Sequence, residues 1–138
     1  MKQIFTIQGE LPDFNSIIAA SKQHWAQYYT FKQQYTNLVW LCARAALKPF
    51  QQFPVDFSIH WYCKDKRKDK DNISAGKKFI LDGLIAARII PSDSWRHVGN
   101  FEDKFYIDRA NPRIVVSMTS QLPTETEETM ETQPISET

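Results

Sequence analysis

The stretch "PVDFSIHWYCKD" (residues 54–65) carries the clearest strand pattern in the sequence. Successive side chains of a strand point to opposite faces of a sheet, so the two sets of alternate residues separate by character. One face carries apolar side chains: Val55, Phe57, Ile59, Trp61 and Cys63. The other face carries more polar ones: Asp56, Ser58, His60 and Tyr62. The pattern predicts a half-buried strand around which the rest of the domain packs.

Periodic patterns on either side of this strand predict the remaining elements. Alternation predicts a first strand over residues 2–9, and apolar residues at three- and four-residue steps predict helices over 21–48 and 72–88. Two β-rich runs at 101–108 and 112–120 are joined by "RAN" beside a proline, and we expect them to pair as an antiparallel hairpin. The order β-α-β-α-β-β predicts a single small α+β domain, with helices packed on one face of a mixed sheet.

The composition predicts one compact domain without a membrane segment. The chain has 138 residues, 42% of them hydrophobic, which is enough for a single core. No stretch approaches the run of about eighteen apolar residues that a membrane helix needs, and the N-terminus lacks the features of a signal peptide. We therefore expect a cytoplasmic protein. Cys42 and Cys63 have no neighbour at a metal-site spacing, which favours buried free thiols over a disulfide or zinc site.

The net charge of +1 conceals an uneven distribution. All seventeen Lys and Arg precede residue 121, and with eleven acidic residues they give residues 1–120 a net charge of +6. Such a body is a plausible partner for nucleic acid, although a surface excess of this size is also ordinary. Residues 121–138 hold five glutamates, two prolines and no aromatic or basic residue, a composition typical of a disordered acidic tail. The tail can shield the basic body or simply be an inert terminus.

The segment "DKRKDKDNISAGKK" (residues 65–78) mixes acids with many basic residues just after the central strand. If the chain stays extended there, Asp69 and Asp71 point the same way, and two converging carboxylates repel unless a cation lies between them. Oxygen ligands select a hard ion, so Mg²⁺ is the expected metal and Mn²⁺ a substitute. The surrounding positive charges would then hold a phosphate backbone. The alternative is a solvated charged loop.

Three further side chains extend the possible site. Lys78 precedes Asp82 by four residues on the predicted helix, which allows an ion pair that holds the ammonium near the carboxylates, or a plain surface pair of about 0.3–0.5 kcal/mol. Asp93 lies in the next loop and would be a third metal ligand if that loop returns to the sheet. It can equally form a turn with its serine neighbours. His97 could serve as a general base, but a hydrogen-bonded structural role is favoured.

These residues together resemble the RusA-type Holliday junction resolvases, small endonucleases common in bacteriophages and prophages. The family pattern is an Asp-x-Asp-Asn, a Lys four residues before a helical Asp, and an acidic loop eleven residues farther on. This chain matches it with Asp69, Asp71, Asn72, Lys78, Asp82 and Asp93. Pro12 and Asn15 are similar to an N-terminal motif of the family, so the resemblance spans about residues 3–119. The chain departs from the family in having Ser92 before Asp93, and Lys77 competes with Lys78 as the functional lysine.

The resemblance implies a homodimer that binds a four-way DNA junction and nicks two strands symmetrically with Mg²⁺, in DNA recombination and repair. It implies that Asp69, Asp71 and Asp93 hold the metal and that Lys78, positioned by Asp82, stabilises the transition state. Asn72 would orient a ligand or cap the helix. The expected phosphate contacts are Lys64, Lys66, Arg67, Lys68, Lys70 and Lys77. No small-molecule cofactor is expected. Two alternatives stay open: a branched-DNA-binding dimer with little or no turnover, and a nuclease with relaxed preference for forks and flaps.

Overall fold

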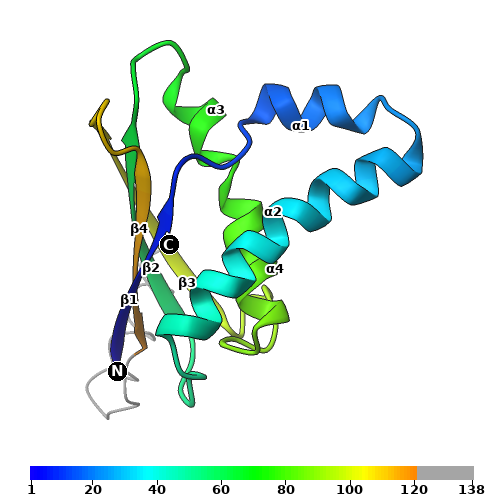
Figure 1. Ribbon diagram of the computed structural model, residues 1–138. Helices are drawn as coiled ribbons and strands as arrows, with labels where there is room; N and C mark the ends of the chain where they lie inside the picture. Colours follow the sequence, from blue (N-terminus) through cyan, green and yellow to red (C-terminus); the bar gives the residue numbers. More distant parts are fainter. Residues whose placement is uncertain (121–138) are drawn as a thin grey trace, which may run out of the picture.

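The computed structural model describes residues 1–120, which form one mixed four-stranded sheet with four helical segments (Figure 1). The elements follow in the order β1 (Lys2–Gln8), α1 (Phe14–Ser21), α2 (Trp25–Ala46), β2 (Val55–Cys63), α3 (Lys70–Ser74), α4 (Lys77–Ala86), β3 (Val98–Ile107) and β4 (Arg113–Ser120). The predicted small α+β domain with a mixed sheet is confirmed. The predicted acidic tail, residues 121–138, lies outside the described residues.

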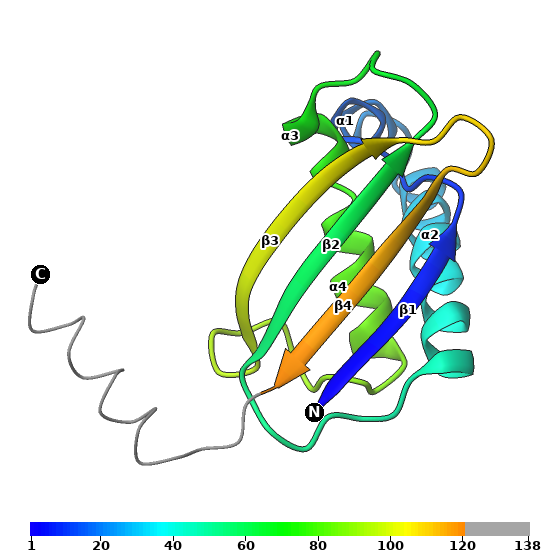
Figure 2. The same cartoon turned by 90° about the vertical axis from the view of Figure 1, so that its left-hand side faces the viewer.

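The strand predicted from 54–65 is an interior strand of the sheet. The strand order is β1-β4-β2-β3, so β2 pairs on one side with β4 and on the other with β3. Its burial alternates along its whole length, and the predicted apolar face is the buried one. All helices lie on that face (Figure 1), and the other face of the sheet is open (Figure 2). Exposure of the polar face follows from this one-sided cover.

The predicted hairpin between residues 101–108 and 112–120 is wrong. β3 runs parallel to β2, whereas β4 runs antiparallel to it on the opposite side, so the two strands never pair. The short loop between them passes over the end of β2, where the Asp108 amide donates to the Cys63 carbonyl at 2.8 Å. β2 is the more buried strand and has two partners, while β3 is largely exposed and forms an edge. Burial of the apolar face of β2 against the core outweighs the preference of a short connection for a hairpin. Both β3 and β4 therefore pair with β2 and not with each other.

The helix predicted over residues 21–48 is α2, and a separate helix that was not predicted, α1, precedes it, with a bend at 22–24 between them. α1 begins at Phe14 because Asp13 caps it: the Asp13 carboxylate accepts a hydrogen bond from the Ser16 backbone amide at 2.8 Å. α2 packs against α4 and β1 through its buried residues Val39 and Ala43. Figure 1 shows α1 and the start of α2 projecting away from the sheet as an arm.

The helix predicted over residues 72–88 is divided into α3 and α4. The division falls at Gly76, where a Cβ would lie 3.0 Å from Leu11 Cβ and 3.4 Å from the Trp61 ring. The chain therefore passes close against the core at this point, where a Cβ would require its neighbours to shift by a few tenths of an ångström. After this point α4 carries the chain back along the sheet to its opposite end (Figures 1 and 2).

The core lies between the sheet and the helices. It includes the fully buried side chains Ile7, Val39, Ile59, Phe79, Ile80, Leu84, Val116 and Met118. Both cysteines are free thiols as predicted, Cys63 buried and Cys42 half-buried. No helix in residues 1–120 is long and apolar enough to cross a membrane.

Candidate metal and nucleic-acid site

Asp69 and Asp71 lie where β2 gives way to α3. Asp69 is the residue before α3 and has an extended backbone, but its carboxylate makes no capping hydrogen bond. Asp71 is in the first turn, and its Oδ1 accepts only a local hydrogen bond, from the Asn72 amide at 2.9 Å. Both side chains are exposed, and both line the same two hollows, so the structure brings this pair together. The chain turns helical at Lys70, so the expected extended conformation does not continue through both aspartates.

The larger hollow is a pocket of about 630 Å³ between this turn and the end of β3. Its charged lining consists of three acids and three bases: Asp65, Asp69, Asp71, Lys66, Lys68 and Lys70. Phe105 and Tyr106 of β3 form part of its wall. Since the formal charges of the lining cancel, a divalent cation at the carboxylates would leave the pocket positive and favourable to a phosphate backbone. The carboxylate oxygens of Asp69 and Asp71 are the hard ligands that Mg²⁺ takes.

The smaller hollow, of about 360 Å³, lies on the α1 side of the same aspartates. Phe14 and Asn15 line it, together with Asn72. Asp69 and Asp71 therefore stand between a basic, aromatic pocket on one side and the N-terminus of α1 on the other.

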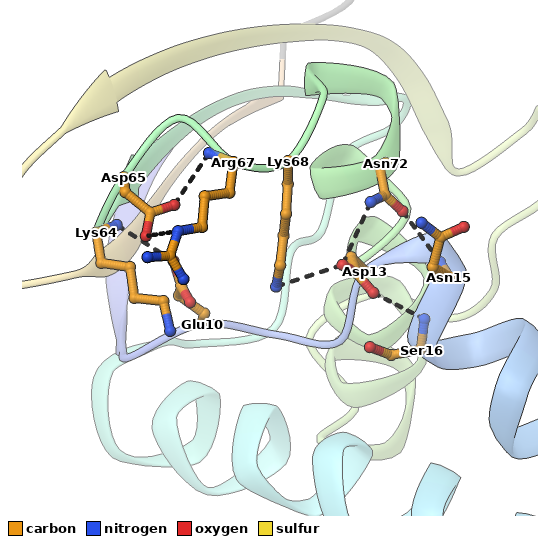
Figure 3. Close-up of polar contacts among 9 residues, drawn as sticks. All are labelled: Glu10, Asp13, Asn15, Ser16, Lys64, Asp65, Arg67, Lys68 and Asn72. Carbon is orange, nitrogen blue, oxygen red and sulfur yellow. Dashed lines mark hydrogen bonds and ion pairs between the residues drawn. The ribbon is translucent and has the colours of Figure 1, made fainter.

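A buried aspartate that the sequence analysis did not single out fixes this turn in place (Figure 3). The Asp13 side chain is only 8% exposed, and its Oδ2 lies 3.3 Å from Lys68 Nζ and accepts from Asn72 Nδ2 at 3.3 Å. Asn72 Oδ1 in turn accepts from the Asn15 amide at 3.0 Å. Asn72 thus caps α1 rather than its own helix. The "LPDFN" and "DKDN" motifs are physically joined, which their distance in sequence could not reveal.

The surroundings of Asp13 favour the ionised form of its carboxyl group. Burial acts to raise the pKa of the Asp13 carboxyl, but the hydrogen bonding from Ser16 and the charge of Lys68 outweigh it and lower the pKa below its usual value. Asp13 is therefore a carboxylate at neutral pH. Lys68 keeps an opposite charge as its partner, and its side chain is 42% exposed at the pocket.

The other basic residues predicted to contact phosphate differ in their surroundings. Lys66 and Lys70 line the pocket, and Lys70 Nζ lies 5.8 Å from the centre of the Phe105 ring. Arg67 is 87% exposed and pairs with Asp65 at 3.6 Å. The Lys64 amide donates to Glu10 at 3.3 Å, which fastens the start of the loop to the turn after β1. The loop therefore presents most of its cations to solvent beside the aspartates.

Lys77 and Lys78 have separate partners. Lys77 Nζ lies 2.7 Å from Asp103 Oδ2 and 4.5 Å from the centre of the Phe101 ring, so its charge is engaged with β3. Lys78 Nζ lies 3.6 Å from Asp82 Oδ2, which confirms the predicted pair across one helical turn. The Lys78 side chain is 52% exposed and free to reach outward, whereas that of Lys77 is 21% exposed. This contrast favours Lys78 as the lysine available to a ligand.

Within a single chain, Asp93 lies far from Asp69 and Asp71. It precedes β3, whose first residue Val98 pairs with Val55 at the start of β2, while Asp69 and Asp71 follow the end of β2. Nine residues of strand separate these ends by about 27 Å, and both views show the loop before β3 opposite α3 (Figures 1 and 2). The expectation that this loop returns to the aspartates is wrong, because a strand parallel to β2 must begin at the end where β2 begins.

The surroundings of Asp93 are those of a hydrogen-bonded turn. Ser92 Oγ lies 2.6 Å from His97 Nδ1 and 2.9 Å from Ser94 Oγ, which confirms the structural alternative for His97. Within residues 1–120, no group of three or more His, Cys, Asp and Glu side chains is arranged to hold a metal ion. Any metal at Asp69 and Asp71 would therefore complete its coordination with water, substrate or a second chain.

Neither the models of known protein families nor the curated protein sequences contain a match to this chain.

Proposed function

We propose that the protein is a Mg²⁺-dependent endodeoxyribonuclease of the RusA type that resolves four-way DNA junctions by paired, symmetric nicks. The observation that supports this most is the shared pocket, in which the exposed carboxylates of Asp69 and Asp71 lie among Lys66, Lys68 and Lys70. Carboxylates alone would repel a polyanion, and lysines alone would only bind it. Both together are what metal-assisted cleavage of a phosphodiester needs.

The proposed roles follow from where each side chain lies. Asp69 and Asp71 would hold Mg²⁺, an ion that commonly takes one or two carboxylates and leaves its other positions to water and phosphate. When bound there, Mg²⁺ supplies a Lewis acid for the scissile phosphate and a more acidic water as nucleophile. Lys66 and Lys70 would hold neighbouring phosphates. Lys78, positioned by Asp82, would approach the same strand from α4, and Lys64 and Arg67 would contact it farther along the loop.

A homodimer is part of this proposal. Four large apolar side chains are exposed on the arm formed by α1 and the start of α2: Phe14, Ile18, Trp25 and Tyr29. Exposed apolar side chains of this kind favour an interface, and a second copy packed there would reach the hollow beside Phe14 and Asn15. Asp93 of the partner subunit could then supply the carboxylate that one chain does not bring to the site. A two-fold dimer also offers two identical sites for two symmetric cuts.

The test compares a synthetic four-way junction, a fork and a linear duplex at one salt concentration. With Mg²⁺ or Mn²⁺ we expect paired nicks in the junction, and with Ca²⁺ we expect binding without cutting. Equal cutting of fork and junction would indicate the relaxed nuclease. Binding of the junction with no cutting under any metal would indicate the branched-DNA-binding dimer, the alternative favoured by the lack of a three-carboxylate group within residues 1–120 of one chain.

A further inference from the structure

A row of stacked side chains crosses the open face of the sheet and ends at the candidate site. Arg113 on β4, Tyr62 on β2 and Tyr106 on β3 are register partners on three adjacent strands. The Tyr62 and Tyr106 rings are stacked, with centroids 4.9 Å apart and planes inclined by 21°. The Arg113 guanidinium lies 3.9 Å from the centre of the Tyr62 ring on the β4 side. The row is therefore a continuous stack that starts with a cation.

The first member of the row is held firmly. Arg113 Nη1 donates to Asp108 Oδ2 at 2.8 Å and to the Asn111 carbonyl at 2.9 Å. This fixes the guanidinium against Tyr62, and Tyr62 in turn supports Tyr106. His60 also contacts Tyr106, with ring centroids 5.5 Å apart. Both of these aromatic neighbours of Tyr106 belong to β2, so they support its ring from the β2 side.

The row stops at Tyr106, because β3 is the edge strand of the sheet that residues 1–120 form. Tyr106 is 39% exposed, and its ring has no further strand beside it on the outer side. An aromatic face that is supported from behind and open in front is a stacking platform for another planar ring. Nucleobases stack on such platforms in proteins that bind single strands, with little dependence on sequence.

The position of Tyr106 selects nucleic acid as the occupant. Tyr106 lines the pocket that also contains Asp69 and Asp71, and the same pocket contains Lys66 and Lys70. Phe105 and Tyr106 face opposite sides of β3, so this pocket lies at the sheet edge, where Lys66 and Lys70 would offer cations to the phosphates of a nucleotide whose base stacks on Tyr106. A base within an intact duplex has both faces covered by its neighbours, so only an unpaired or unstacked base can occupy the platform.

We propose that Tyr106 binds an unpaired nucleobase next to the strand held at Asp69 and Asp71, and that this contact selects DNA with open, branched or single-stranded regions. The inference rests on the proposed nuclease function, which it deepens by naming the feature of the substrate that is recognised. Tyr62 and Arg113 are positioning residues for this contact, since they support the Tyr106 ring.

The experiment measures binding of a fluorescent oligothymidylate of about ten nucleotides in the presence of Ca²⁺. Tyr106→Ala should weaken binding about tenfold, a loss in the range of one base–aromatic stack. Tyr106→Phe keeps the ring and should bind as the wild type does. Trp40→Ala removes another exposed aromatic side chain, on α2 and outside the pocket, and is the matched control; it should leave oligonucleotide binding unchanged.

Two readouts make the outcome decisive. A 2-aminopurine in the oligonucleotide should be quenched by the wild type and by Tyr106→Phe, but not by Tyr106→Ala. Unchanged affinity and quenching in Tyr106→Ala would overturn the proposal, and so would a shift in oligomeric state alone, which would make Tyr106 a protein contact. Junction nicking in Mg²⁺ is measured in parallel. If the wild type nicks the junction but oligonucleotide binding does not depend on Tyr106, only the stacking proposal is refuted. If binding depends on Tyr106 but no nicking occurs, only the nuclease proposal is refuted.

Discussion

The Asn72 side chain donates to the buried Asp13 carboxylate at 3.3 Å across 59 residues of sequence. Asp13 is the cap of α1, and Asn72 directly follows Asp71. The contact therefore links the entry to the helical arm with the turn that carries the candidate metal ligands. With the Lys68 ion pair on the same carboxylate oxygen, it sets where that turn lies on the molecule.

Asp13→Asn should lower the free energy of unfolding at pH 7 by about 1–3 kcal/mol, the usual effect of losing hydrogen bonds to a charged group. Asparagine can still cap α1, but it loses the Lys68 ion pair. Because the folded-state pKa of Asp13 lies below its unfolded value, the ionised carboxylate stabilises the fold above about pH 4. That contribution is lost as the pH falls through the folded-state pKa. Urea unfolding at neutral and acidic pH measures both effects.

Asp65→Asn is the control for this prediction, since Asp65 lies on the same loop but pairs only with the exposed Arg67. Its stability should change by less than about 1 kcal/mol. A difference between Asp13→Asn and the wild type that stays constant down to pH 3 would contradict the role given to the Asp13 charge.

Gly83→Ala should destabilise the domain by about 1–3 kcal/mol through overpacking. A Cβ at Gly83 of α4 would lie 2.5 Å from two carbon atoms of Val39 and 3.1 Å from the Thr36 carbonyl oxygen of α2. Adding Val39→Ala in the double variant should relieve part of the clash, so the two changes should not be additive. Thermal or urea unfolding measures this. Additive losses would show that the two helices do not approach each other as closely as described.

Lys70→Ala should reduce the dependence of DNA affinity on salt. If Lys70 neutralises one phosphate, its loss should lower the slope of log affinity against log salt concentration by about 0.9 for duplex arms. Binding is measured in Ca²⁺ over a range of salt concentrations. Lys48→Ala, an exposed lysine just after α2 and outside the pocket, should leave the slope unchanged. Equal slopes for all three proteins would remove Lys70 from the DNA interface.

A mixture of Asp71→Asn and Asp93→Asn proteins should regain activity if the site is shared between subunits. Each variant alone should be inactive, but a mixed dimer has one site with an intact Asp71 and an intact partner Asp93. Random association would restore about a quarter of all sites. Co-expression followed by a nicking assay measures this, with Asp69→Asn plus Asp71→Asn as the control that stays inactive. A mixture that also stays inactive would exclude Asp93 of the partner subunit from the site.

The sequence predicted those parts of the fold that depend on local periodicity. The alternation in 54–65 identifies β2 and its buried face correctly, and the Lys78–Asp82 spacing correctly predicts an ion pair. The division at Gly76 was missed because the apolar stripe continues across it, and the close approach of Leu11 and Trp61 to this point exists only in the folded chain.

Strand pairing and the third carboxylate depend on contacts that periodicity does not encode. A short loop between 101–108 and 112–120 favours a hairpin. In the structure, however, these two strands pair on opposite sides of the buried strand β2. The place of Asp93 follows from that pairing, since it depends on the direction of β3. Asp13 could have been noticed as a cap before an apolar run, but its link to Lys68 and Asn72 exists only in the folded chain.

The most direct measurement is the behaviour of Asp71→Asn toward a four-way junction, assayed for both binding and Mg²⁺-dependent cleavage. Asparagine is nearly the same size, so the fold and the lysines of the pocket should remain as they are. We predict a protein that shifts the junction as the wild type does but cuts it at least about a hundredfold more slowly, because a metal ligand is lost. Cleavage at the wild-type rate by Asp71→Asn would contradict a metal centre at Asp69 and Asp71.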